Sequence, residues 1–197
     1  MVGSRVLDEA ASRGHDLIAV FRKQRPTTLP PGVTAVASDG HEMSGLFDGV
    51  DAIVMATRPA PGQESSVAAT TTALLDAAAA ADARILVVGG AAPLRNPGNP
   101  DRLVIDSPEY VPPAIRPIAA ASVAQLEACR THSANWIYLS PPALLEPGHR
   151  TGKYRRGTTT LITAADGVSR ISAEDLAVAV LDELENPCGT EHFTVGY

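Results

Sequence analysis

Short apolar runs alternate with helical stretches along the whole chain, and this alternation limits the fold more than any other feature. The runs at residues 51–56 and 84–90 are almost continuously apolar, as is typical of parallel strands covered on both faces. Helices are predicted at residues 2–13, 64–81, 118–132 and 172–186. The pattern predicts an α/β fold in which a parallel sheet lies between two helical layers. Further strands are expected at residues 16–21, 33–37, 135–142 and 191–197.

Composition excludes several classes of protein. The 197 residues suit one domain, and a hydrophobic content of 45% supports a sizeable core. A formal net charge of −6 without a long basic run argues against nucleic-acid binding. No apolar run is long enough to cross a membrane, and we expect none as a partner. Cys129 and Cys188 show no metal-binding spacing, which favours reduced thiols in a cytoplasmic protein.

The first helix begins unusually close to the start of the chain. It opens at Gly3 and Ser4 and is closed by Gly14, and a strand and a basic cluster follow. A nucleotide-binding βαβ unit needs a strand and a glycine-rich turn before this helix, because the pyrophosphate sits on the helix N-terminus. Here the sequence starts at what would be the last glycine of that turn.

Five segments together resemble the atypical short-chain dehydrogenase/reductase group, close to its flavin-reductase-like, NmrA-like and biliverdin-reductase-B-like members. This resemblance implies a single Rossmann-like domain over residues 1–197, with a doubly wound parallel sheet in a three-layer α/β/α arrangement. It also implies an NAD(P)H cofactor, and either a monomer or a homodimer. The segments are VGSRVLDEAASRGHDLIAVFR, DGVDAIVMA, ILVVGGA, WIYLSPPALLEPGHRTGKYR and SRISAEDLAVAVLDELENP.

The group's N-terminal strand and its G-A-T-G-x-x-G turn have only a partial counterpart. Met1, Val2 and Gly3 match the final three positions of that pattern. Three explanations remain: a start at an internal Met that omits roughly ten residues, a degenerate paralogue, or a wrong alignment. We favour the first, because the rest of the fold is intact. The absent strand would lie at the centre of the sheet, so we expect a marginal or rearranged sheet.

Two groups of residues are candidates for binding the cofactor phosphates. Backbone N–H groups at Gly3 and Ser4 would face the pyrophosphate, although an ordinary frayed N-terminus is an equal alternative. Arg22 and Lys23 follow the second expected strand, where an acid would select NAD and an Arg receives the phosphate of NADP. The sequence has no acid there, so NADP is preferred and NAD is the alternative. A solvated basic turn without a cofactor role would also explain Arg22 and Lys23.

The resemblance implies contacts with the rest of the cofactor. Asp39 would lie near the adenine, although an Asp that forms a turn before Gly40 is as good an explanation. Ala56, Thr57 and Arg58 would lie beside the ribose and nicotinamide, because ligands bind beyond the carboxyl ends of the strands. Arg58 is also readily explained as a surface cation.

Two further strand ends complete the expected cleft. Gly89 and Gly90 would lie beside the ribose and nicotinamide, and Ser140 and Pro141 near the nicotinamide carboxamide. For Ser140 and Pro141 the alternative explanation is a proline pair that ends the strand. Tyr154 would lie where the group closes over its substrate, or in a solvated loop.

The usual catalytic residues of short-chain dehydrogenases are absent. The helix that should carry Y-x-x-x-K reads IAAASVAQLEACR, and no serine stands at the expected position. This disfavours ordinary carbonyl reduction and leaves hydride transfer from NADPH to a small flavin-like or quinone-like acceptor. A non-catalytic dinucleotide sensor, or a degenerate chain with impaired cofactor binding, is the alternative. The five histidines show no metal-ligand spacing, and each is expected at the surface or in a turn.

Overall fold

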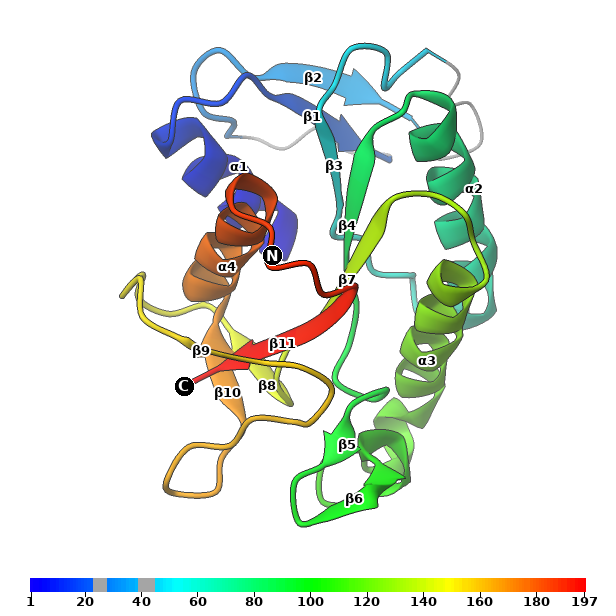
Figure 1. Cartoon of the computed structure of the whole chain (residues 1–197), viewed down its shortest axis with the longest axis vertical. Helices are drawn as coiled ribbons and strands as arrows, with labels where there is room; N and C mark the ends of the chain where they lie inside the picture. The colour runs from blue at the N-terminus through cyan, green and yellow to red at the C-terminus, as the bar shows by residue number, and fades with distance from the viewer. Residues whose placement is uncertain (23–27, 39–44) are drawn as a thin grey trace.

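The computed structural model describes residues 1–22, 28–38 and 45–197. Its main sheet has five strands, all parallel except the last, which runs antiparallel to its neighbour (Figure 1). The predicted α/β fold with a mostly parallel sheet is confirmed. In spatial order the strands are β3 (Ala52–Met55), β4 (Arg84–Val88), β7 (Trp136–Ser140), β11 (His192–Gly196) and β9 (Arg155–Gly157).

A second, separate sheet holds the two strands that come first in the chain. β1 (Ile18–Phe21) pairs in parallel with β2 (Thr34–Ala37), and among the described residues neither strand pairs with the main sheet. The sheet is therefore divided between β1 and β3, where the resemblance places a central strand, and the expected marginal stability stays a prediction. The sheet is not closed by a new pairing of β1 with β3.

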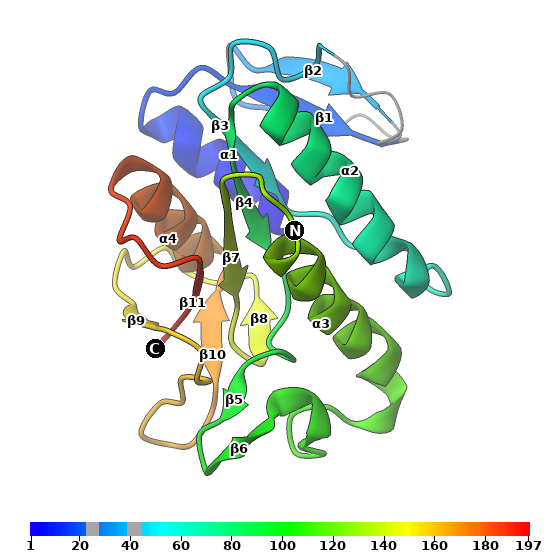
Figure 2. The ribbon, with the colours of Figure 1, turned by 45° about the vertical axis from the view of Figure 1, so that its right-hand side comes forward.

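Four helices cover the two faces of the main sheet (Figures 1 and 2). α1 (Val2–Ser12) and α4 (Ala173–Glu185) pack on one face, with Leu86, Leu139 and Phe193 in their core. α2 (Val67–Ala80) and α3 (Arg116–Arg130) pack on the other face, over residues that alternate with the first set along each strand. This alternation explains why β4, β7 and β11 are almost wholly buried.

Short elements complete the molecule. The predicted start of α4 is confirmed, because the Ser172 hydroxyl accepts a hydrogen bond of 3.0 Å from the backbone N–H of Asp175. A third apolar cluster lies under the loops between β4 and α3. The remaining elements are β5 (Arg95–Asn96), β6 (Asn99–Leu103), β8 (Leu144–Glu146), β10 (Arg170–Ser172), and the 3₁₀ helices η1 (Glu64–Ser66), η2 (Val104–Asp106) and η3 (Pro113–Ile115).

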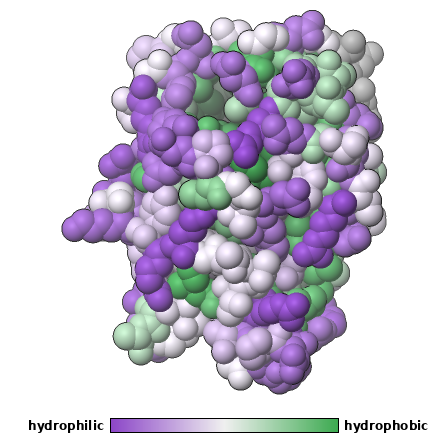
Figure 3. All heavy atoms as spheres, viewed as in Figure 1, coloured by the Kyte–Doolittle hydropathy of each residue, from purple (hydrophilic) through white to green (hydrophobic). Residues whose placement is uncertain are grey.

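In the described parts of the chain, no helix is both long enough and apolar enough to cross a bilayer. On the face shown in Figure 3, hydrophilic and hydrophobic residues are interspersed.

Candidate functional site

The start of α1 lies against the end of β3. A methyl group at Gly3 would stand 3.8 Å from the Cβ of Ala56, which is an ordinary contact distance. No side chain caps the N-terminus of α1, and its first turn contains no acidic residue. The backbone N–H groups of this turn therefore point out of the helix beside the carboxyl end of β3, as an anion-binding helix start requires.

Ser4 uses its hydroxyl within the helix. The hydroxyl donates a hydrogen bond of 3.0 Å to the carbonyl oxygen of Met1, and the Arg5 guanidinium donates to the same oxygen at 3.2 Å. Ser4 can therefore contribute its backbone N–H to an anion more readily than its side chain.

Arg22 joins the ends of β1 and β3. Its guanidinium donates a hydrogen bond of 2.6 Å to the backbone carbonyl of Arg58, and both arginines are exposed. This contact brings two positive charges to the edge of the molecule where α1 starts. The structure thus brings together the predicted residues Gly3, Arg22, Ala56 and Arg58.

For three other predicted residues, no contact with this group can be given. Thr57 is exposed, between Ala56 and Arg58 in the loop after β3. Lys23 and Asp39 lie outside the described residues, so their predicted contacts with a phosphate and with the adenine stay predictions.

Gly89 and Gly90 follow β4 at the predicted position, and the protein's own side chains explain the need for glycine there. A methyl group at Gly89 would overlap the hydroxyl and Cζ of Tyr138, and one at Gly90 would lie 2.9 Å from the Ser122 Oγ. Both contacts come from the α3 side of the sheet. The glycine pair therefore accommodates packed side chains, whether or not a cofactor ribose lies beyond it.

Tyr138 is buried, so its hydroxyl cannot donate a proton to a ligand at the protein surface. Its hydroxyl donates to the carbonyl oxygen of Ser122 at 2.8 Å and lies 3.3 Å from Gln125 Oε1. Burial raises the pKa of Tyr138, so its phenol stays protonated. Gln125 continues the chain of contacts to Thr71 on α2, with 3.2 Å between Nε2 and Oγ1. This internal polar network links three elements around the end of β4.

Ser140 and Pro141 are buried at the end of β7, where the sequence predicted them. The Ser140 Oγ lies 3.0 Å from Nε2 of His192 on the neighbouring strand β11. The His192 ring also meets the Tyr138 ring edge-on, with 5.5 Å between centroids. The Ser140 side chain is thus held by the protein itself, and a ligand at this strand end would meet mainly backbone groups and Pro141.

The prediction of a surface or turn position for His192 is wrong. Only 8% of the residue is exposed, because β11 is covered on both faces. Burial, with a smaller effect from the positive charge of Arg130, lowers the pKa of His192 to about 4, so the ring is neutral at neutral pH. Its register opposite Tyr138 could not be read from the sequence, because these residues are distant in the chain.

Tyr154 lies on the α1/α4 side of the molecule and is tied to a helix there. Its hydroxyl donates a hydrogen bond of 2.6 Å to Asp182 on α4. Nearby, the buried Asp175 carboxylate accepts hydrogen bonds from the backbone N–H groups of Thr151 and Gly152, both at 2.8 Å. These contacts fasten the loop before β9 to α4, which favours a structural role for Tyr154.

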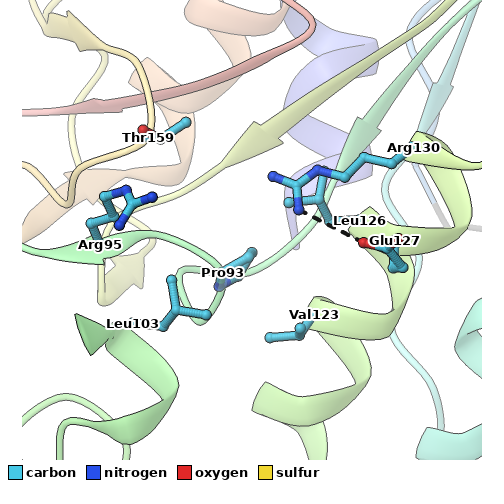
Figure 4. A pocket seen from close by; sticks show the side chains of 8 residues that line it. All are labelled: Pro93, Arg95, Leu103, Val123, Leu126, Glu127, Arg130 and Thr159. Carbon is cyan, nitrogen blue, oxygen red and sulfur yellow. Dashed lines mark ion pairs between the residues drawn. The ribbon is translucent and has the colours of Figure 1, made fainter. Parts of the chain in front are cut away.

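A cavity of about 190 Å³ lies beside α3 (Figure 4). Arg130 and Glu127 form an ion pair of 3.7 Å on one side, and Arg95 and Thr159 stand on the other. Ligand pockets usually measure roughly 300–1,000 Å³, so this cavity is too small to enclose a flavin ring system by itself. Its remaining lining residues are Pro93, Leu103, Val123 and Leu126.

Among the residues that the structure describes, no group of three or more His, Cys, Asp or Glu side chains could hold a metal ion. The predicted residues that the structure describes lie at the start of α1 and at the ends of β1, β3, β4 and β7. This edge of the sheet is the candidate site.

Comparisons with known proteins match nearly the whole chain. Residues 1–187 match the model of an NAD(P)H-binding family. The Bacillus subtilis protein YwnB is 37% identical over 198 residues, covering 98% of this chain and 92% of that protein. A candidate epimerase from Bacteroides thetaiotaomicron is 32% identical with a TM-score of 0.89, covering 100% of this chain and 92% of the other. A candidate NADH-flavin reductase from Streptococcus pneumoniae is 26% identical with a TM-score of 0.87, covering 99% and 93%.

Proposed function

Since the chain belongs to the NAD(P)H-binding family, we propose that it binds a nicotinamide dinucleotide at this edge and passes a hydride to a small flavin-like or quinone-like acceptor. The observation that carries the proposal is the meeting of the α1 N-terminus, Arg22 and the end of β3. Backbone N–H groups and two arginines form a suitable environment for the phosphates of a dinucleotide. The flavin-like acceptor is also supported by the similarity to the candidate NADH-flavin reductase.

We propose NADP as the preferred cofactor and NAD as the alternative. Arg22 stands directly after β1, where this fold places the group that contacts the ribose 2′ position. Its guanidinium has five N–H donors, so the bond to the Arg58 carbonyl leaves others for a phosphate. Lys23 would add a second cation, and Asp39 would lie near the adenine.

The remaining cofactor contacts follow from the ends of the later strands. Thr57 and the Gly89–Gly90 pair would lie along the ribose and nicotinamide, and Ser140 and Pro141 near the carboxamide. The cofactor would supply the hydride. The chain would contribute position and orientation, because Tyr138, which lies against Gly89 at the end of β4, is buried and hydrogen-bonded.

Cofactor titration tests the proposal. NADPH should bind to the 197-residue chain saturably and more tightly than NADH. Arg22→Gln should weaken NADPH binding about tenfold or more and change NADH binding much less, because one charge-assisted contact is worth roughly 1.5–3 kcal/mol. Arg102→Gln on the remote hairpin is the matched control and should change neither. Equal loss of both cofactors in Arg22→Gln would refute the role in NADP selection.

Turnover separates an enzyme from a sensor. NADPH oxidation that depends on added FMN or a quinone supports the reductase. Saturable NADPH binding without such turnover would instead support a non-catalytic redox sensor, since the missing Tyr/Lys pair fits both hypotheses. Absence of saturable binding of either dinucleotide would leave only a degenerate chain with an impaired site.

We also propose a cytoplasmic location. Both cysteines are free thiols, and Cys188 is exposed. Exposed free thiols persist in a reducing compartment. Fractionation of the producing cells would test this directly, with the protein expected among the soluble cytoplasmic proteins.

A further inference from the structure

The cavity beside α3, here called the α3 cavity, has an apolar inner wall (Figure 4). Leu126 on α3 is only 1% exposed, and Pro93 after β4 is buried. Val123 and Leu103 are half-buried and add to the same apolar wall. A volume of about 190 Å³ holds roughly six water molecules at ~30 Å³ each, so the wall can cover a short hydrocarbon chain.

The outer rim of the α3 cavity is positively charged. Arg95 and Arg130 stand on opposite sides of it, and both are exposed to solvent. Glu127 pairs with Arg130 at 3.7 Å, so it offsets one of the two positive charges. In the described parts of the chain, Arg95 has no acidic partner, and its one side-chain hydrogen bond runs from Nη1 to the Pro100 carbonyl oxygen at 2.8 Å. The rim therefore keeps a net positive charge and guanidinium donors for a ligand.

Arg95 is held in place by the backbone on both sides. Its N–H group donates a hydrogen bond of 2.7 Å to the carbonyl oxygen of Thr159, and its own carbonyl accepts one of 3.0 Å from Leu161. These bonds fasten β5 to the chain after β9, and Thr159 itself lines the α3 cavity. An arginine that is already ordered in this way loses less conformational entropy when it binds an anion.

Two buried polar atoms on the same face of the sheet have no protein partner. Phe193 and Val195 of β11 pack in the α1/α4 core, so His192 and Thr194, which alternate with them, face the α3 side. Among the described residues, neither Nδ1 of His192 nor Oγ1 of Thr194 has a hydrogen-bond partner. The charge of Arg130 contributes to the low pKa of His192, so this ring lies within electrostatic reach of the rim. Buried groups of this kind are usually satisfied by a ligand or an ordered water, which supports a polar guest on this face.

The α3 cavity is separate from the candidate cofactor site. Its eight lining residues include none of the residues proposed to contact the dinucleotide. Arg130 ends α3 shortly before β7 begins at Trp136, so this end of the helix lies toward the amino ends of the strands. The candidate cofactor site lies at the carboxyl ends of the strands. A ligand in the α3 cavity and a dinucleotide therefore have different contacts.

We propose that the α3 cavity binds a short organic carboxylate of about four carbons, whose six non-hydrogen atoms match the volume of roughly six water molecules. The carboxylate lies at the rim, where Arg95 and Arg130 donate hydrogen bonds to it. The hydrocarbon chain lies against Leu126 and Pro93. A guanidinium group suits the two oxygens of a carboxylate, and the apolar wall favours an organic acid over an inorganic anion.

Titration with butyrate tests this proposal. Butyrate should bind the 197-residue chain saturably by calorimetry. The side-chain Nε–H signals of Arg95 and Arg130 in NMR spectra should shift along the same binding curve. Butylamine reverses the charge of the probe, 1-butanol removes the charge, and inorganic phosphate lacks the hydrocarbon chain. Each of these three should bind at least about tenfold more weakly, because each lacks one of the two contacts.

Three variants locate the ligand. Arg95→Gln should weaken butyrate binding about tenfold or more, because it removes a charge-assisted contact. Arg102→Gln is the matched control: it removes an exposed arginine from the same hairpin that does not line the α3 cavity, and it should bind butyrate normally. Val123→Phe fills the cavity and should abolish butyrate binding. Circular dichroism checks that the variants are folded, and all three should bind NADPH as the unmodified chain does.

Several results would overturn the proposal. Absence of saturable butyrate binding would do so, as would equal or tighter binding of butylamine, 1-butanol or phosphate. Unchanged butyrate affinity in Arg95→Gln or in Val123→Phe would place the ligand elsewhere and refute the site. The butyrate titrations contain no dinucleotide, so they can fail while the NADPH titration succeeds, and the reverse.

Discussion

A single methyl group added at Gly89 should lower the free energy of unfolding strongly. In Gly89→Ala the new Cβ would overlap the hydroxyl and Cζ of Tyr138 and lie 2.6 Å from Cε1. Contacts below 3.0 Å do not occur for real Cβ atoms, so either the ring or the end of β4 must move. The ring belongs to a fully buried residue between β4 and α3.

The magnitude follows from two effects. Forcing a side chain aside in a packed core costs about 1–3 kcal/mol. Moving the Tyr138 hydroxyl away from the Ser122 carbonyl leaves buried polar groups unpaired, which costs a further ~1–3 kcal/mol. A central value of about 4 kcal/mol is a large part of the roughly 5–15 kcal/mol that stabilises a typical protein. At about 2–4 °C per kcal/mol for a chain of this size, Tm should fall by roughly 8–16 °C.

Urea unfolding followed by circular dichroism measures the effect. Gly98→Ala is the control, because Gly98 does not have a positive φ and its nearest neighbour would lie 3.4 Å away. It should lose less than about 1 kcal/mol. Gly89→Ala combined with Tyr138→Leu should lose clearly less than the sum of the two single changes, because the ring is then absent. A Gly89→Ala variant as stable as the Gly98→Ala control would refute the reasoning.

Two further predictions concern pH. Burial opposes ionisation of Asp175, but hydrogen bonds from Thr151, Tyr197 and Gly152 outweigh it and lower the pKa of the carboxyl below its usual value of 3.8. The stabilising effect of the ionised Asp175 is therefore present above that usual pKa and is lost as pH falls through the lower pKa of the folded protein. Asp175→Asn should flatten this fall in unfolding free energy on the acid side of the usual pKa, measured by urea unfolding at a series of acidic pH values. The pKa of His192 is lowered from 6.5 to about 4, so the unfolding free energy should fall as pH drops from 6.5 towards 4. His192→Gln should remove this pH dependence of the unfolding free energy. An imidazole that titrates near pH 6.5 by NMR in the folded protein would contradict the prediction.

The layered fold was predictable because its signals are local. Near-continuous apolar runs such as Arg84–Val88 indicated buried parallel strands, and Ser172 followed by Asp175 marked the start of α4. These features depend on residues close together in the chain.

The candidate site was only partly predictable, because its contacts depend on register between distant strands. The approach of Arg22 to the Arg58 carbonyl, and that of Ser140 to His192, join residues 36 and 52 positions apart. The pattern Gly89-Gly90 suggested close approach by a ligand, whereas the structure shows approach by Tyr138 and Ser122. A glycine pair gives the same sequence signal in both cases.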